Sequence, residues 1–476
     1  TDRAVARLLN TYLDAADAAG RKLMPNLPRL DRPRPLADRP IGFATAAAAL
    51  QWLEAERANL VAAVHHTHTH GPPDATWHLA DALHAFFRLR RYCGDWLATA
   101  LAGHVAAQSA GARRAAAAMR YAIADAYWSL GDYRRAAGQF DLAWSDASAT
   151  GWSELQVAVL QGQGQNRLDS GDQAGAIDCY NRALQLAETS DHRPGLASAI
   201  ASVGLTYHQV GRLDDAIKAF TRARELARET GTPHGEASST GNLGFAYWQR
   251  GELSQAEEHL LDALRLHGLA GARNGEANVH DTLGRVYADT GQYDEALRHA
   301  RHSLALARDI GDRRIQVDGF NTLAEVYRRL GHEADALRHY HEALELAVEI
   351  GYQYGQAPAL LGIAACLLDT GREAEAIHQA QAALAVGRGN YRTFEAQAHT
   401  LLARIHLVLG QPTESAHQAR LALAIEDETG QHLDRGRTLL VLADATTESG
   451  DADAANAYRH EAQAIFEATG AAEARE

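Results

Sequence analysis

The chain has 476 residues, more than one compact hydrophobic core can bury, so we expect several domains or one long repeat array. Its content of 46% hydrophobic and 22% charged residues excludes a disordered chain, and the absence of an apolar run of about 18 residues excludes a transmembrane protein. The formal net charge of −14 argues against a protein that binds nucleic acid through its phosphates, since such binding requires a basic face.

The termini and the cysteines indicate the cellular setting. No basic, apolar leader follows Thr1, so we expect no secretory signal, and a first residue other than Met suggests a segment of a longer protein. Cys93, Cys179 and Cys366 are far apart, which is typical neither of a disulfide framework nor of a zinc site. These features predict a cytoplasmic protein.

The N-terminal region combines two amphipathic patterns with a proline-rich segment. We expect helices over residues 4–19 and 44–64, whereas the prolines within 25–40 exclude a helix and indicate an extended linker. Residues 1–40 are therefore interpreted as a helix and linker at the end of a preceding module. Residues 41–74 are interpreted as an adaptor helix with a histidine-rich end.

Four histidines at the end of that adaptor helix are the only weak candidates for a metal site. They are His65, His66, His68 and His70. Imidazoles at this density can bind a transition metal. However, cationic side chains are also favoured at the carboxyl end of a helix, and no Cys or carboxylate completes a set of ligands here. We therefore expect no metal in this chain.

A first, divergent helix pair follows. Helical patterns over 76–92 and 95–108 flank Gly94, which lies 37 residues before Gly131. Terminal units of a repeat array are usually atypical because they cap the stack. Residues 75–111 are therefore expected to be a capping repeat.

From residue 112 to 476 the sequence repeats itself about every 40 residues. Each unit has a glycine after a helical stretch, and small residues follow that glycine by five and by twelve positions. A second glycine follows by twenty positions in seven of the nine units. The first glycines are Gly131, Gly171, Gly211, Gly251, Gly291, Gly331, Gly371, Gly410 and Gly450. Such a period indicates a repeat array of nine units.

One unit shows what is repeated. After Gly251, apolar residues recur at three- and four-residue steps, which place them on one face of a helix. They are Leu253, Ala256, Leu260, Ala263 and Leu264. A similar stripe precedes Gly251, whose positive φ would end the first helix of the pair. Because neither helix can bury its stripe alone, neighbouring pairs must stack.

The order of these residues resembles the tetratricopeptide repeat (TPR). The pattern is present at Leu243-Gly244, Tyr247, Gly251, Ala256, Leu260 and Ala263. Each unit is about six residues longer than the standard repeat of about 34, and glycine replaces its closing proline. The resemblance implies an all-α, right-handed superhelical solenoid of about ten antiparallel helix pairs, preceded by a short helical adaptor.

A second resemblance concerns the region before the array. Residues 49–64, 82–90 and 96–101 are similar to the start of the TPR region in actinobacterial AfsR-like regulators, and residues 7–13 are similar to the join that precedes it. In these signal-transduction ATPases (STAND proteins), an NB-ARC nucleotide-binding module precedes the repeats. The present sequence has no GxxxxGK[ST] phosphate loop. We therefore expect no cofactor in this chain, and ATP or ADP only in a module outside it.

TPR geometry predicts a ligand groove along the inner face. The inward positions lie 2, 3, 6, 10 and 13 residues before each turn glycine. The predicted groove residues are Tyr121, Asp125, Trp128, Gln165, His208, Phe245, Trp248, Asn278, Asp281, Arg285, Asp318, Asn321, Glu325 and Arg328. Aromatic anchors followed by charged groups suit an extended peptide. The alternative is that the aromatic residues only pack between helices and that the charges form a solvated face.

These observations predict a non-catalytic sensor and interaction domain of a bacterial transcriptional regulator. No serine elbow, phosphate loop or HExxH motif is present, so we expect no enzyme. The expected partner is a protein or peptide, including the regulator's own ATPase module, and not nucleic acid or a membrane. Two alternatives remain open, a stand-alone scaffold and a receptor for a peptide pheromone.

Overall fold

The chain folds into stacked helix pairs. The computed structural model describes residues 2–32, 42–190, 193–388 and 390–475, and within them it contains 22 α-helices, one short 3-10 helix and no strand. Two helices, α1 (Asp2–Leu23) and α2 (Ala46–His70), precede ten consecutive pairs. The predicted all-α TPR solenoid is confirmed.

Each pair joins two helices of similar length across a tight turn, and each pair contacts the next. The first five pairs are α3 (Pro73–Arg90) with α4 (Cys93–Ser109), α5 (Arg113–Ser129) with α6 (Tyr133–Ala149), α7 (Ser153–Asp169) with α8 (Gln173–Thr189), α9 (Arg193–Gln209) with α10 (Leu213–Glu229), and α11 (Pro233–Arg250) with α12 (Leu253–Ala270). The other five are α13 (Arg273–Asp289) with α14 (Tyr293–Ile310), α15 (Arg313–Arg329) with α16 (Glu333–Ile350), α17 (Gln353–Asp369) with α18 (Glu373–Gly387), α19 (Arg392–Val408) with α20 (Pro412–Thr429), and α21 (His432–Glu448) with α22 (Ala452–Thr469). The 3-10 helix η1 (Ala472–Arg475) follows α22.

The turns have the predicted backbone conformation. All nine glycines that join the two helices of a unit have positive φ, between 68° and 89°. A side chain is disfavoured in this left-handed region, which explains why glycine recurs there.

The first pair corrects one sequence expectation. Its turn is made by Arg91 and not by Gly94, because Arg91 has φ 59° whereas Gly94 lies within α4. Arg91 precedes Gly131 by 40 residues, so this pair keeps the period of the array. The guanidinium of Arg91 is buried against Ser129 and lies over the ring of Trp128, 5.1 Å from its centroid. These contacts offset the cost of the left-handed backbone at a residue other than glycine.

The adaptor helix is longer than expected. α2 does not end at residue 64 but continues to His70, where the Gly71 amide donates to the Thr67 carbonyl at 3.0 Å. The four histidines therefore lie on the last turns of the helix, and all are exposed.

The described part of the proline-rich linker packs against the array. Leu27 and Leu30 are buried, and Arg29 forms a buried ion pair of 2.8 Å with Asp81 of α3. The Asn26 amide donates to the Thr232 hydroxyl at the start of α11, at 2.6 Å. Residues 33–41, which include the expected domain boundary at residue 40, lie outside the described residues.

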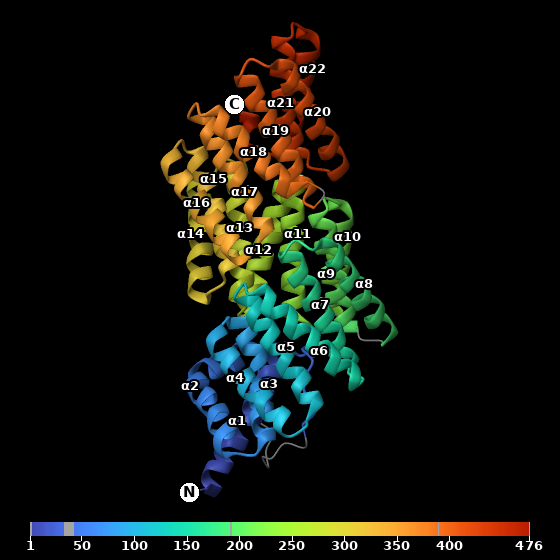
Figure 1. Cartoon of the computed structure of the whole chain (residues 1–476), viewed down its shortest axis with the longest axis vertical. Helices are drawn as coiled ribbons and strands as arrows, with labels where there is room; N and C mark the ends of the chain where they lie inside the picture. The colour runs from blue at the N-terminus through green and yellow to red at the C-terminus, as the bar shows by residue number, and fades with distance from the viewer. Residues whose placement is uncertain (1, 33–41, 191–192, 389, 476) are drawn as a thin grey trace.

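The solenoid winds tightly enough for successive superhelical turns to touch. Figure 1 shows α7 to α10 on one side of the elongated molecule and α13 to α16 on the other, with the N-terminus at the bottom and the C-terminus near the top. Helices ten apart in the series are in contact, namely α2 with α12, α3 with α13, and α11 with α21. Five pairs therefore complete one turn, and the inner face of one turn is partly covered by the next.

Among the helices that the structure describes, none combines the length and the apolar character needed to cross a lipid bilayer.

Candidate ligand cavity

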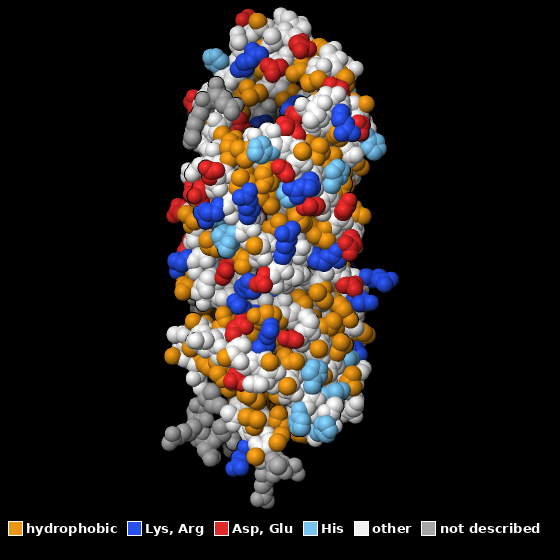
Figure 2. All heavy atoms as spheres, turned by 90° about the vertical axis from the view of Figure 1, so that its left-hand side faces the viewer, with side chains coloured by type: hydrophobic (Ala, Val, Ile, Leu, Met, Phe, Trp, Pro, Cys, Tyr) orange, Lys and Arg blue, Asp and Glu red, His pale blue; other side chains and the backbone are white. Residues whose placement is uncertain are grey.

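The inner face of the C-terminal half encloses a cavity of about 680 Å³. Its wall is formed mainly by the first helices of six successive pairs, α11, α13, α15, α17, α19 and α21, and η1 contributes Ala472 and Glu473. The space-filling view shows the molecule hollowed near its C-terminal end, with acidic and basic side chains inside the opening (Figure 2). This is the size of a site that takes a small molecule or a few residues of a peptide.

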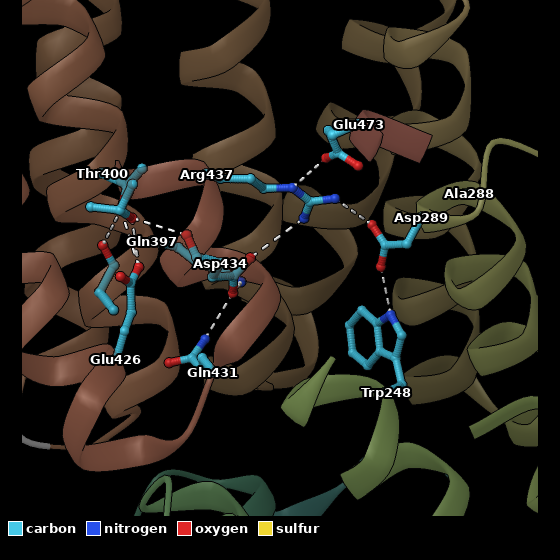
Figure 3. Close-up of polar contacts among 12 residues, drawn as sticks. Trp248, Ala288, Asp289, Gln397, Thr400, Glu426, Gln431, Asp434, Arg437 and Glu473 are labelled. Carbon is cyan, nitrogen blue, oxygen red and sulfur yellow. Dashed lines mark hydrogen bonds and ion pairs between the residues drawn. The ribbon is translucent and has the colours of Figure 1, made fainter. Parts of the chain in front are cut away.

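A cluster at one side of the cavity joins the two superhelical turns. The Arg437 guanidinium of α21 donates to Glu473 of η1 at 2.7 Å and to Asp289 of α13 at 2.8 Å (Figure 3). The indole N–H of Trp248 donates to the other oxygen of Asp289 at 2.8 Å. We call these four residues the Arg437 clasp. Burial by itself raises the pKa of Asp289, but the charges of Arg437 and Arg329 outweigh it and lower that pKa.

Glu325 is the centre of a second cluster on the cavity wall. Its carboxylate accepts two hydrogen bonds from Arg328, at 2.9 and 3.0 Å, and one from Arg329 at 2.7 Å. The Tyr340 hydroxyl donates to the same carboxylate at 2.9 Å. Although burial raises the pKa of Glu325, the two guanidiniums hold it well below its usual value. Glu325 is therefore charge-paired with both arginines.

Two amide oxygens in the wall have no partner in the described part of the chain. They are Asn321 Oδ1 and Gln249 Oε1, and both are buried. The amide nitrogen of Asn321 is engaged, since it donates to the Gly355 carbonyl at 3.0 Å. A buried acceptor without a donor is costly, so these two oxygens mark places where the packing behind the cavity wall is not fully satisfied.

Five of the fourteen predicted groove residues line this cavity. They are Trp248, Arg285, Asn321, Glu325 and Arg328. A sixth, Tyr121, lines a separate cavity of about 220 Å³, whose wall includes residues 23–28 of the N-terminal segment. That they bind a ligand stays a prediction.

The other eight take part in contacts within helices or between neighbouring helices. Asp125 forms an ion pair with Arg88, and Asp169 accepts hydrogen bonds from the Trp128 indole at 2.8 Å and the Gln165 amide at 3.0 Å. Further along the chain, His208 packs on Phe245, which in turn packs on Trp248. The remaining three, Asn278, Asp281 and Asp318, face Arg314 or Arg285.

Burial changes the ionisation of this inner network. It lowers the pKa of His208 to about 4, so the imidazole is neutral at neutral pH. It raises the pKa of Asp318 to about 7, although the charge of Arg314 acts in the opposite direction. These groups are suited to hold helices together more than to meet a ligand.

Sequence reasoning missed the wall formed by the last three units. The inward positions 13, 10 and 6 residues before Gly371, Gly410 and Gly450 all line the cavity. They are Pro358, Leu361, Ala365, Gln397, Thr400, Arg404, Arg437, Leu440 and Asp444. The rule that predicted the first groove residues would have found them, had it been continued to the end of the array.

The histidine-rich end of α2 does not form a cluster. The rings of His66 and His70 are stacked with their centroids 5.3 Å apart. Across the described residues, no group of three or more His, Cys, Asp or Glu side chains is arranged to hold a metal ion.

The repeat pattern and the stacked pairs agree with the family comparison. The model of the MalT-like TPR region matches residues 192–458, and a tetratricopeptide repeat model matches residues 153–229. The chain belongs to the MalT-like TPR family. As an array of this family, it is a protein-interaction domain. No curated protein matches its sequence significantly.

Solved structures share the fold at low sequence identity. A Rap protein in complex with Competence and Sporulation Factor is 12% identical, with a TM-score of 0.57 over 74% of this chain and 98% of that chain. NprR in complex with its cognate peptide NprX is 15% identical, with a TM-score of 0.53 over 72% and 99%. A STAND protein with a TPR sensor from Pyrococcus horikoshii is 16% identical, with a TM-score of 0.41 over 71% and 54%.

Proposed function

We propose that this chain is the sensor domain of a bacterial transcriptional regulator, that it binds a protein or peptide segment in the C-terminal cavity, and that binding controls an ATPase module outside the chain. The observation that carries the proposal is the cavity itself. Its wall combines the aromatic rings of Trp248, Tyr354 and Phe394 with polar and charged side chains such as Gln397 and Arg404. Rings supply contact area and polar side chains can form hydrogen bonds with a peptide backbone, which together suit an extended peptide.

Binding can be transmitted because the cavity lies between superhelical turns. The Arg437 clasp joins α21 and η1 to α11 and α13. The N-terminal segment reaches the same turn, since Asn26 bonds to Thr232 at the start of α11. A ligand that separates or draws together the walls would therefore change both the curvature of the array and the position of its N-terminal adaptor.

The ATPase module enters the proposal through the resemblance of residues 49–64 to the start of the TPR region in STAND regulators. In this scheme the repeats need no cofactor, and ATP or ADP is bound by that module. The sensor works in the cytoplasm, where the three buried thiols stay reduced.

A receptor for a peptide pheromone is the second candidate. It uses the same cavity but requires an effector other than an NB-ARC module. The fold that this chain shares with NprR, solved with its cognate peptide, favours this candidate over a passive scaffold.

Affinity selection tests the proposed function. The immobilised chain is exposed to a pool of random synthetic hexapeptides, retained peptides are identified by mass spectrometry, and their Kd values are measured by calorimetry. Leu361→Trp fills the cavity from a half-buried position on its wall. We expect this variant to weaken binding at least about tenfold. The exposed Leu421 on α20 gives the matched control Leu421→Trp, which should bind normally.

Scattering then tests transmission. A bound peptide should change the radius of gyration, and the NB-ARC module added as a separate protein should bind the peptide-free and peptide-bound chains with different Kd values. If no peptide is retained, ligand sensing in the cavity is wrong. If peptides bind but neither the shape nor the affinity for the module changes, the regulatory part is wrong.

A further inference from the structure

Most of the arginines that line the cavity are neutralised within the chain. Arg328 bonds to Glu325 through two nitrogens. Arg329 bonds to Glu325 and to Asp289, and Arg437 bonds to Asp289 and to Glu473. Because their charges and most of their donors are used, these three arginines hold the wall together and have little left to offer a ligand.

Arg404 of α19 is different. The acidic group nearest to its guanidinium is Asp369, with 3.6 Å between Arg404 Nη2 and Asp369 Oδ1, which is too long for a hydrogen bond. Asp369 is also shared, because its other oxygen accepts from Arg328 at 3.4 Å. Within the described residues, Arg404 donates no hydrogen bond, and 41% of its side chain is exposed.

Arg404 is placed to use these free donors inside the cavity. It shares one face of α19 with Gln397, Thr400 and Leu401, and all four residues line the cavity. Gln397 and Thr400 are held in place, since Gln397 donates to Asp434 at 2.8 Å and Thr400 bonds to the Thr438 hydroxyl at 2.7 Å. The guanidinium therefore projects from a rigid part of the wall.

The electrostatic surroundings leave this cation under-compensated. Burial, and then the positive charge of Arg328, lower the pKa of Arg404, whereas Asp369 and Glu325 act in the opposite direction. An added anion would relieve the repulsion between the two guanidiniums. A partly buried cation that lacks hydrogen bonds gains more from such a partner than a solvated one does.

We propose that Arg404 is the anchor for a carboxylate of the ligand, held by the planar fork of its guanidinium. This inference rests on the proposed function and names the chemistry of the ligand. One guanidinium with free hydrogen-bond donors can take both oxygens of one carboxylate. A carboxylate therefore fits Arg404, whereas a doubly charged phosphate would leave one charge unpaired among the acidic residues of the wall. The carboxylate is either the C-terminus of a peptide or the side chain of an Asp or Glu.

Four hexapeptide pools test the inference and distinguish the two sources. The pools carry a free or an amidated C-terminus, each with or without Asp and Glu. We expect the chain to retain peptides from the pool with both kinds of carboxylate and from at least one of the two pools with a single kind, and few or none from the amidated pool without acidic residues. Retention from only one of the two single-carboxylate pools identifies the source.

Variants then locate the carboxylate. Arg404→Gln should weaken binding of a selected acidic peptide about tenfold or more, which is the usual effect of losing a charged hydrogen bond, while Arg404→Lys should be intermediate. Arg420→Gln makes the same charge change at an exposed position on α20 and should leave the Kd unchanged. Circular dichroism melts verify that each variant is folded.

The outcomes separate this inference from the proposed function. If peptides bind and Leu361→Trp blocks them, but the pools are retained equally or Arg404→Gln changes the Kd less than about twofold, the role of Arg404 is wrong and the cavity remains a ligand site. If no pool is retained, both proposals are wrong.

Discussion

Glu426 of α20 is a carboxyl group held in an environment that disfavours its charge. It is 1% exposed, and Thr438 donates a hydrogen bond of 2.7 Å to one of its oxygens. The other oxygen has no partner in the described part of the chain. Burial, and then the negative charge of Asp434, raise the pKa of Glu426 to about 8, so the group is protonated at neutral pH.

This pKa makes stability depend on pH. In the unfolded chain Glu426 loses its proton near pH 4.3, whereas the folded chain keeps it up to about pH 8. The contribution of Glu426 to the free energy of unfolding is therefore fully present below about pH 4. It is lost as the pH rises to 8, by at most about 1.4 kcal/mol per pH unit. Glu426→Gln removes this dependence.

Urea unfolding of both proteins at pH 5, 6, 7 and 8 measures the effect. We expect the variant to gain stability relative to the wild type at each step. Glu448→Gln, at an exposed position on α21, should give a difference that does not vary with pH. A constant difference for Glu426→Gln as well would contradict the raised pKa.

At the scale of the helix pair, small residues allow the two backbones to approach each other. Ala256 is fully buried in α12, opposite Gly244 of α11. A Cβ atom added at Gly244 would lie 2.6 Å from Leu260 Cγ and 3.2 Å from the Ala256 carbonyl oxygen, so even one methyl group would force a shift. This close approach of the two helices explains why small residues recur in every unit.

Ala256→Leu should overpack this contact and destabilise the array by about 1–3 kcal/mol. The expected result is a lower midpoint of thermal unfolding. Gln255→Leu adds an apolar side chain at the neighbouring exposed position of the same helix and should change the midpoint little. Equal midpoints for wild type and Ala256→Leu would show that the pair is not tightly packed there.

The sequence predicted the helix pairs well because the signals for a pair are local. A positive φ at Gly251 and an apolar stripe after it act within one unit, and the unit is repeated. The turn at Arg91 was not predicted because it lacks such a local signal. No local signal shows that a residue other than glycine will take the left-handed conformation, because its compensation comes from Trp128 and Ser129 in the next pair.

At the scale of the whole molecule, contacts between superhelical turns determine which part of the inner face is open. Asp289 of α13 is central to these contacts, since it accepts from Trp248, Arg329 and Arg437 and is only 4% exposed. Gly251 adds a second contact between turns, because any Cβ there would meet the Leu433 backbone at 3.0 Å.

Asp289→Asn should loosen the association of the turns. It removes the charge that neutralises Arg437 and Arg329 but keeps an acceptor for Trp248, and we expect a loss of about 3 kcal/mol, typical of breaking a buried ion pair. The radius of gyration from small-angle scattering should increase. Asp335→Asn, in an exposed ion pair with Arg338, is the control and should change neither property. An unchanged radius for Asp289→Asn would mean that the Arg437 clasp does not hold the turns together.

Long-range contacts also explain which groove residues could be predicted. Trp248, Arg285 and Arg328 were found because inward positions follow from the repeat. The repeat could not show that His208 and Asp125 are enclosed, since this depends on neighbouring and distant pairs.

By itself the sequence, through its period of 40 residues, determined that the chain forms helix pairs and that these pairs stack. Each helix carries an apolar stripe that it cannot bury by itself. The pitch of the superhelix was decided only by the tertiary structure. Small rotations between neighbouring pairs add up over five units until helices ten apart meet, and no single unit encodes that sum. The same sum leaves a cavity near the C-terminal end and, on its wall, the Arg404 guanidinium, which donates no hydrogen bond within the described residues.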